Sequence, residues 1–195
     1  MKTKSLVLIG VLIIALAAMA APVMAGTTDT QSATVSATLS GSIALSVNTA
    51  AVSLGDIKTV GDHTGAESVS VTTNYNGWYV SVRDNGDGQT SGNARTTNLG
   101  HMSELTSGSA WGTKYLINPL HVQSAGITTP VTVTTDGDIT VDGASDQHFI
   151  HSSANNGGSE IAGIPITITQ TTDADDSALT AGSYFIKLTL IAGPT

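Results

Sequence analysis

Apolar and polar residues alternate along much of this chain. The alternating stretches are Ala33–Leu39, Ile43–Val47, Val69–Tyr75, Trp78–Val82 and Ile164–Ile168. A period of two places successive side chains on opposite faces, so each stretch predicts a strand with one buried face. With several shorter apolar runs they predict about ten strands and no helix. We therefore expect one all-β domain, a β-sandwich or jelly-roll-like fold, over residues 26–195.

Two of these stretches predict particular pairings. Asn76-Gly77 separates Val69–Tyr75 from Trp78–Val82, and this dipeptide is a strong β-hairpin signal because both residues tolerate positive φ. The final run, Tyr184–Leu190, is apolar on both faces, which predicts a single central strand. Pro165 cannot donate to a ladder, so it belongs at a strand start, an edge or a bulge.

The segment 83–112 has a different composition. It is rich in Gly, Asn, Ser and Thr and has few apolar residues, so it predicts no clear secondary structure. A stretch of this length without structure inside a compact domain is unusual and is often functional. It is therefore a candidate binding loop.

Residues 1–25 do not follow the strand pattern. Two lysines precede an apolar run over residues 6–21, and a small-residue site ends at Ala25. This order is typical of a cleaved secretory signal peptide, so we expect a mature chain from Gly26 that is secreted or on the cell surface. Two alternatives stay open. One is a retained membrane anchor, for which the run is short. The other is a pilin-like leader, whose usual acidic residue is missing here.

The charge of the chain restricts the kinds of partner it can bind, and its cysteine content restricts how the fold is stabilised. The chain has fifteen acidic and seven basic residues, a net charge of −8. Two of the basic residues lie in the leader, and the remainder has no basic patch. Nucleic acid is therefore excluded as an expected partner, and so is a membrane after leader removal. The chain has no cysteine, so burial and ladder hydrogen bonds must hold the fold without disulfides.

Candidate chemistry is sparse. Acidic residues cluster at Asp84–Asp87, Asp136–Asp142 and Asp173–Asp176, and such loops could bind Ca²⁺, although Asp and Asn are also ordinary turn residues. His148 and His151 fall on opposite faces of an extended chain, which does not predict a metal site. No nucleophile elbow, phosphate loop or zinc-protease motif occurs. We predict no enzymatic activity, no cofactor and no metal.

The N-terminal stretch is the sharpest functional candidate. Ala33, Val35, Ala37 and Leu39 would line one face of a strand that follows a polar lead, within a candidate donor segment of residues 26–40. A free strand of this kind can add to the exposed sheet edge of a neighbour. The alternative is that it pairs inside its own domain as an ordinary first strand.

The two tryptophans predict different roles. Trp78 shares a strand face with Val80 and Val82 and is expected in the core. Trp111 lies in the Gly- and Ser-rich segment and is the candidate ligand-binding residue, with a ring that could stack on a sugar.

Two segments resemble a known group of proteins. They are Ser70–Val82, which contains Asn76-Gly77-Trp78, and Ile164–Gln170 followed by Ala181-Gly182-Ser183-Tyr184. Both are similar to exported β-sandwich surface proteins of bacteria and archaea, among them camelysin-like matrix fibre subunits and archaeal bundling-pilus subunits. The resemblance implies a fibre in which the N-terminal strand of one subunit completes a sheet of the next. The segment 83–112 has no counterpart in that group.

These observations predict a secreted structural protein. It would be a subunit or accessory of an extracellular filament, matrix or cell-surface layer, with copies of itself or other surface proteins as partners. The alternative is a non-catalytic adhesion module that recognises glycan or another surface protein through residues 83–112.

Overall fold

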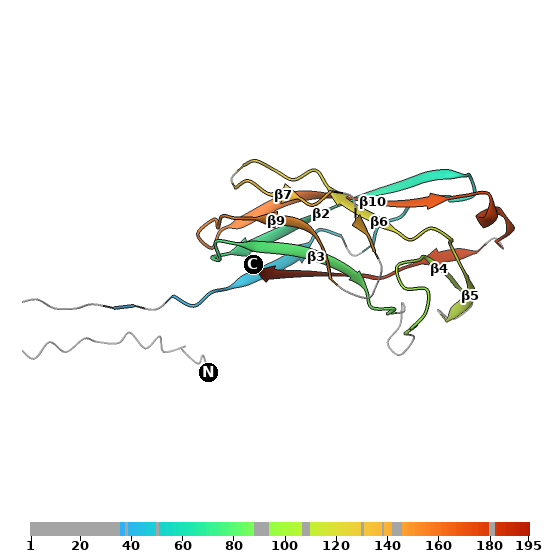
Figure 1. Cartoon of the computed structure of the whole chain (residues 1–195), viewed down its shortest axis with the longest axis horizontal. Coiled ribbons are helices and arrows are strands. Elements are labelled where there is room, and N and C mark those ends of the chain that lie inside the picture. Colours follow the sequence, from blue (N-terminus) through green and yellow to red (C-terminus); the bar gives the residue numbers. More distant parts are fainter. Residues whose placement is uncertain are drawn as a thin grey trace, which may run out of the picture. The chain divides into compact units, whose positions relative to one another are not determined.

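The chain is an all-β protein, as the alternation predicts. The computed structural model describes residues 36–37, 39–49, 51–87, 94–106, 110–129, 131–137, 139–141, 146–179 and 182–195. These form twelve strands and one short 3-10 helix, and every ladder is antiparallel (Figure 1). No described helix has the length and apolarity to span a membrane. The expected signal peptide, residues 1–25, lies outside the described residues.

The chain divides into two compact units, Met1–Thr38 and Leu39–Thr195, and the strands among the described residues belong to the second. Its first sheet has the order β1-β2-β10-β6-β8. These strands are Ile43–Val47 (β1), Gly61–Thr73 (β2), Glu160–Thr172 (β10), His121–Ser124 (β6) and Ile139–Thr140 (β8).

The second sheet has the order β12-β3-β9-β7, and a small third sheet has the order β11-β4-β5. The second sheet consists of Leu188–Pro194 (β12), Trp78–Asp84 (β3), Gln147–Ser152 (β9) and Thr134–Thr135 (β7). The third consists of Ser183–Phe185 (β11), Ser103–Leu105 (β4) and Trp111–Tyr115 (β5), and the 3-10 helix is Asp175–Ala178.

The core lies between the first two sheets. Val69 and Val71 of β2 face Trp78, Val80 and Val82 of β3, and all five are buried. Alternate residues of each strand therefore meet across the interface, as in other sandwiches. Trp78 is in the core, as predicted, and its indole N–H donates to the Ala154 carbonyl at 3.0 Å.

The predicted Asn76-Gly77 hairpin is wrong. β2 pairs with β1 and β10, whereas β3 pairs with β12 and β9, so this turn carries the chain from one sheet to the other. Neither Asn76 nor Gly77 takes the positive φ that a two-residue hairpin turn requires. Gly77 instead lies close to Thr195, since a Cβ at position 77 would be 2.0 Å from the Thr195 hydroxyl oxygen.

The predicted central strand over Tyr184–Leu190 is also wrong. The chain changes sheets at Ile186-Lys187, so β11 belongs to the third sheet and β12 to the second. β12 lies at an edge, and its side chains are only half-buried. The run from Tyr184 to Leu190 is apolar on both faces because β11 and β12 pack against different surfaces.

Two local predictions, the position of Pro165 and the lack of structure over residues 83–112, have different outcomes. Pro165 directly follows a bulge in β10, where the register shifts between Ile161 and Ile164 and Gly163 has a φ of 68°, so its expected position is confirmed. The segment 83–112, expected to lack structure, contains the end of β3, all of β4 and the first residues of β5.

Candidate functional site

The predicted donor segment precedes β1. Ala37 is exposed, and Leu39 exposes 84% of its surface. Neither belongs to a strand, nor does Ser36, so at these positions the segment does not pair inside its own domain, and its role as a donor strand stays a prediction; Ala33 and Val35 lie outside the described residues. Burying a leucine side chain contributes about 1.5–3 kcal/mol, so Leu39 still has apolar surface that contact with another molecule would stabilise.

The stretch between this segment and β1 is fixed by the connection from β2 to β3. Asn74 Oδ1 accepts a hydrogen bond from the Ser42 N–H at 2.7 Å, and Asn74 Nδ2 donates to the Ser40 carbonyl at 3.0 Å. Gly41 lies so close to Tyr75 that a Cβ at position 41 would be 2.3 Å from the ring carbon Cζ. The place where the N-terminal segment leaves the sandwich is therefore set by side chains far along the sequence.

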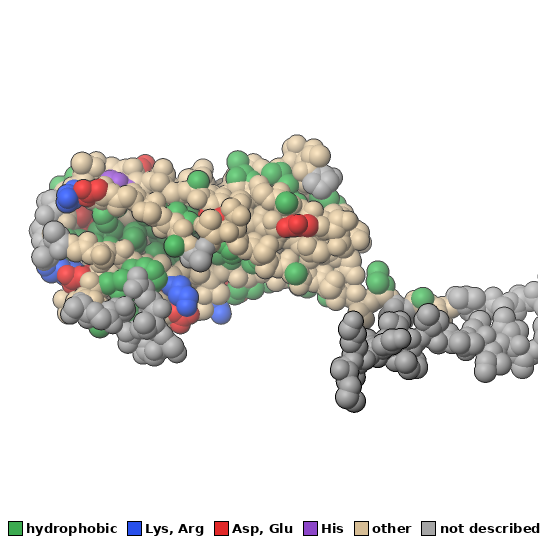
Figure 2. Space-filling view, turned by 180° about the vertical axis from the view of Figure 1, so that it is seen from behind, with side chains coloured by type: hydrophobic (Ala, Val, Ile, Leu, Met, Phe, Trp, Pro, Cys, Tyr) green, Lys and Arg blue, Asp and Glu red, His purple; other side chains and the backbone are tan. Residues whose placement is uncertain are grey.

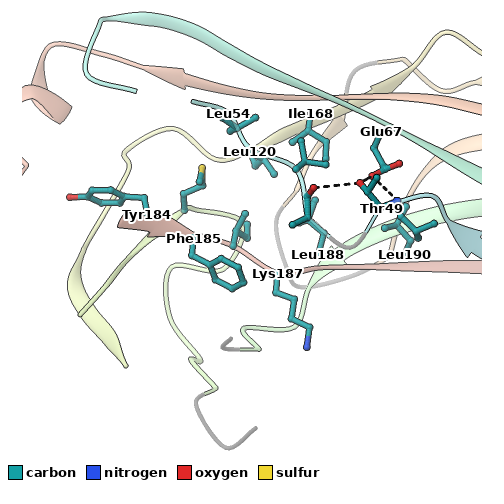
Figure 3. A pocket seen from close by; sticks show the side chains of 15 residues that line it. Thr49, Leu54, Glu67, Leu120, Ile168, Tyr184, Phe185, Lys187, Leu188 and Leu190 are labelled. Atoms are coloured by element: carbon teal, nitrogen blue, oxygen red, sulfur yellow. Dashed lines mark hydrogen bonds between the residues drawn. The ribbon is translucent and has the colours of Figure 1, made fainter. Parts of the chain in front are cut away.

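A groove of about 360 Å³ opens beside the two edge strands β1 and β12 (Figure 3). Its walls are the end of β1, Thr49 and residues 51–54, part of β10, and the stretch from Tyr184 to Leu190. The lining is mostly aliphatic and includes Val52, Leu54, Leu120, Ile168, Leu188 and Leu190. On the face shown in Figure 2, hydrophobic side chains reach the surface mainly near the left end of the folded unit, with charged side chains around them.

One wall of the groove depends on a glycine in β2. A Cβ at Gly65 would lie 2.3 Å from Val52 Cγ1 and 3.0 Å from Leu54 Cδ2. Glycine in a strand interior often marks such a close approach. Gly65 therefore lets residues 52–54 pack onto β2.

Glu67 ties the start of this wall to β2. Its carboxylate accepts hydrogen bonds from the Thr49 hydroxyl, from the Thr49 N–H at 3.2 Å and from the Ser68 N–H at 2.7 Å. Burial alone would raise the pKa of Glu67, but these hydrogen bonds to the ionised form outweigh burial and lower the pKa.

We expect the groove wall to loosen in acid. Since the pKa of Glu67 is lower in the folded state, its contribution is fully present above the ordinary glutamate pKa of about 4.3. That contribution is lost as the pH falls through the folded-state pKa. Hydrogen-exchange protection of the Thr49 and Ser68 amides should fall over that range. In the control variant Glu67→Gln, protection should be weaker at neutral pH and independent of this titration; identical profiles in the two chains would contradict the expectation.

Asp84, at the end of β3, organises the segment that follows it. Its side chain is fully buried, and Oδ1 accepts from the Gly86 N–H at 2.7 Å while Oδ2 accepts from the Gly100 N–H at 2.9 Å. Gly86 is required here, because it has a φ of 73° and a Cβ would lie 2.0 Å from the Arg95 carbonyl oxygen. Asp84 is thus already engaged and is not an open ligand for Ca²⁺.

Arg95 is the cation that pairs with Asp84. It is also buried, and its Nη1 donates to the carbonyls of Asn98 at 2.7 Å and His101 at 2.8 Å and to the Ser103 hydroxyl. Burial lowers the pKa of the Arg95 guanidinium, and the Asp84 carboxylate opposes that shift. These hydrogen bonds hold Asp84, Arg95 and residues 98–103 together.

Trp111 is the first residue of β5 and does not lie in an unstructured loop, which corrects its expected position. Its ring is half-buried beneath the Arg95 guanidinium, 4.7 Å from the ring centroid, and its centroid is 5.8 Å from that of Phe185. The predicted role of Trp111 in ligand binding stays a prediction.

The Asp173–Asp176 cluster and His148 are engaged within the fold, and Asp136 pairs with His151 Nδ1 at 3.0 Å; Asp138 and Asp142 lie outside the described residues. Asp173 Oδ1 accepts from the Asp175 N–H at 2.8 Å, and Asp176 Oδ1 accepts from the Ile117 N–H at 3.1 Å. His148 stacks on Tyr79 with centroids 3.9 Å apart. Among the described residues no three His, Asp or Glu side chains form a group that could hold a metal ion.

Sequence reasoning missed the groove. Its walls include Val47, Thr49, Val52 and Leu54, then Met102 and Leu120, and the stretch from Tyr184 to Leu190. Val52 and Leu54 do alternate with polar residues, but the double-sided apolar run at 184–190 predicts one buried strand. Only the sheet change at Ile186-Lys187 brings these segments together.

Comparisons with known proteins identify no relative of this chain. No family model, no curated protein and no solved structure matches this chain. The function must therefore be argued from the molecule itself.

Proposed function

We propose that this protein is a secreted, non-catalytic structural subunit that joins its neighbours through its N-terminal segment. It would build or decorate an extracellular filament, matrix or cell-surface layer. The observation that carries the proposal is Leu39, a large apolar side chain left 84% exposed on a segment outside the sheets. Ala37, two residues earlier on the same alternating face, is exposed too.

The sheet edges support the same proposal. Among the described strands, β1 and β8 end the first sheet and β12 and β7 end the second, and each has one hydrogen-bonded neighbour, so such an edge offers unpaired main-chain groups to another strand. Main-chain hydrogen bonds then give affinity, and alternate side chains entering pockets give specificity. An acidic surface with no basic patch suits a partner that is recognised by backbone and apolar contacts.

The test is direct imaging. We expect negative-stain micrographs of the chain beginning at Gly26 to show fibres. A chain that lacks residues 26–39 should stay monomeric, since it keeps Ser40 and the Asn74 hydrogen bonds but has lost the segment that reaches the neighbour. Circular dichroism of the shortened chain should still show a β-sheet spectrum.

The opposite result would favour the adhesion module. In that case both chains would be monomers, and the longer one would bind a glycan array. The observation that favours this second candidate is the Trp111 ring, which Arg95 and Phe185 hold in place while part of it stays accessible. Loss of binding in Trp111→Ala would then assign the site.

A further inference from the structure

We propose that Asn76 is a site of self-modification, at which the side-chain amide is converted to a carboxylate without an enzyme. Asn76 lies in the exposed connection between β2 and β3 and is followed by Gly77. Glycine favours this reaction because it has no side chain to block the approach of its main-chain nitrogen to the preceding side chain. The chain has two further Asn-Gly pairs, Asn85-Gly86 and Asn156-Gly157, and the structure distinguishes Asn76 from both.

The reaction needs only the chain and water. The Gly77 nitrogen gives its proton to solvent base and forms a bond to Asn76 Cγ. The bond from Cγ to Nδ2 then breaks, and ammonia leaves with a proton from water, which closes a five-membered succinimide ring. Water adds to one of the two ring carbonyls and opens the ring to aspartate or to isoaspartate. One water is consumed and one ammonia is released, with no change of oxidation state.

The side chain of Asn155, in the loop between β9 and β10, assists the first step. Asn155 Nδ2 donates a hydrogen bond to Asn76 Oδ1 at 2.6 Å. Attack on Cγ turns this oxygen into an oxyanion, and a donor already aimed at it stabilises the intermediate. Asn155 Oδ1 accepts from the Gly157 N–H at 3.0 Å, so the donor is itself held in position.

The attacking and leaving groups at Asn76 are both unengaged. Among the described residues, no acceptor takes a hydrogen bond from the Gly77 N–H or from Asn76 Nδ2. The Gly77 carbonyl, by contrast, accepts from the Thr195 N–H at 3.0 Å. Because Asn76 is exposed, water and hydroxide reach the site.

Asn85-Gly86 has the opposite arrangement. The Gly86 N–H donates to the buried Asp84 carboxylate at 2.7 Å, and Asn85 Nδ2 donates to the Thr189 hydroxyl at 2.9 Å. A negative charge beside the Gly86 nitrogen opposes the loss of its proton, because like charges repel. The nucleophile and the leaving group of this pair are therefore both restrained.

Asn156-Gly157 is restrained as well. The Gly157 N–H donates to Asn155 Oδ1, and Asn156 Nδ2 donates to the Ser159 carbonyl. The Ser159 N–H donates back to the Asn156 carbonyl at 3.2 Å, which closes a turn around the pair. Asn76 is thus the one of the three asparagines whose attacking nitrogen is open and whose carbonyl oxygen is already bound by a donor.

The aspartate product fits the same site. A carboxylate at position 76 accepts the hydrogen bond from Asn155, and a charged acceptor makes that bond stronger. The conversion adds one negative charge to a chain whose net charge is −8. The exposed end of the sandwich at the β2–β3 connection therefore becomes more acidic as the protein ages.

Peptide mapping of the folded, full-length protein tests the proposal. Samples kept in mildly alkaline buffer are digested with trypsin, and mass spectrometry follows the conversion of each asparagine. Cleavage after Lys and Arg places the three Asn-Gly pairs in separate peptides, residues 59–83, 84–95 and 115–187. We expect Asn76 to convert at least tenfold faster than Asn85 or Asn156. In urea the three rates should become similar, since glycine follows each of them.

Asn155→Asp tests the role of the donor. The variant keeps an oxygen that accepts from the Gly157 N–H but has no N–H to donate to Asn76. Conversion of Asn76 should slow at least tenfold in the folded variant and stay unchanged in urea. Ser153→Asp is the matched control, because it adds the same charge at an exposed position of the same loop and leaves Asn155 in place. It should convert at the rate of the unmodified protein.

Three results would overturn the proposal. The first is equal conversion of the three pairs in the folded protein, and the second is faster conversion of Asn85 or Asn156. The third is an Asn76 that converts in urea but not in the folded protein, because the fold would then protect it. An unchanged rate in folded Asn155→Asp would overturn the role given to Asn155.

Discussion

Replacing Arg95 by methionine is expected to lower the free energy of unfolding by about 3–5 kcal/mol. The substitution leaves Asp84 as an uncompensated charge with no exposed side-chain surface, and it removes the donors to the Asn98 and His101 carbonyls. Domains of this size are stable by about 5–15 kcal/mol, so the loss is a large fraction of the total. Urea unfolding followed by tryptophan fluorescence measures it.

Arg83→Met is the matched control. Arg83 pairs with Asp146 at 3.4 Å, but both side chains are about one third exposed, at 39% and 33%. Exposed pairs contribute about 0–1 kcal/mol, so this variant should remain close to the unmodified chain. Equal losses in the two variants would show that the Asp84–Arg95 pair has no special role in stabilising the fold.

Introducing aspartate on the apolar face of the N-terminal segment is expected to abolish assembly without unfolding the subunit. In Val35→Asp or Leu39→Asp, each contact between subunits would have to bury a carboxylate without a partner, which costs several kcal/mol. Because Leu39 is 84% exposed in the single chain, Leu39→Asp should change the free energy of unfolding by no more than about 0.5 kcal/mol. Sedimentation velocity and negative-stain imaging detect the assembly, and urea unfolding measures stability.

The polar face of the same segment provides the control. Ser36→Asp adds the same charge one residue from Val35, on the side that faces water in the proposed contact. It should assemble like the unmodified chain. If Val35→Asp and Leu39→Asp form normal fibres, the N-terminal segment does not join the subunits.

The alternation of residue types predicted local structure well. β1, β3 and the second half of β2 lie where the period of two placed them, and Trp78 is buried with Val80 and Val82. This works because alternation reflects which face of a strand is buried, a property of a few neighbouring residues. The first half of β2 shows no alternation of apolar and polar residue types, because its residues are mostly polar. Its side chains nevertheless alternate between half-buried and exposed.

Pairing was harder to predict because it depends on residues far apart in sequence. Asn76-Gly77 has the composition of a hairpin turn, yet β2 and β3 each bury a face, and the chain places those faces opposite each other in two sheets. Likewise, Asp84 and Arg95 lie in a polar segment that gave no sign of order. Their ion pair forms because the end of β3 and the residues after it enclose both groups.

The sequence alone determined the all-β class and the positions of several strands, because each depends on local spacing. The tertiary structure decided which strands are neighbours, where the chain changes sheets, and that a groove lies beside β1 and β12. Those features arise from pairings between segments as distant as Val82 of β3 and Leu190 of β12, and no local pattern specifies which distant surface a strand will meet.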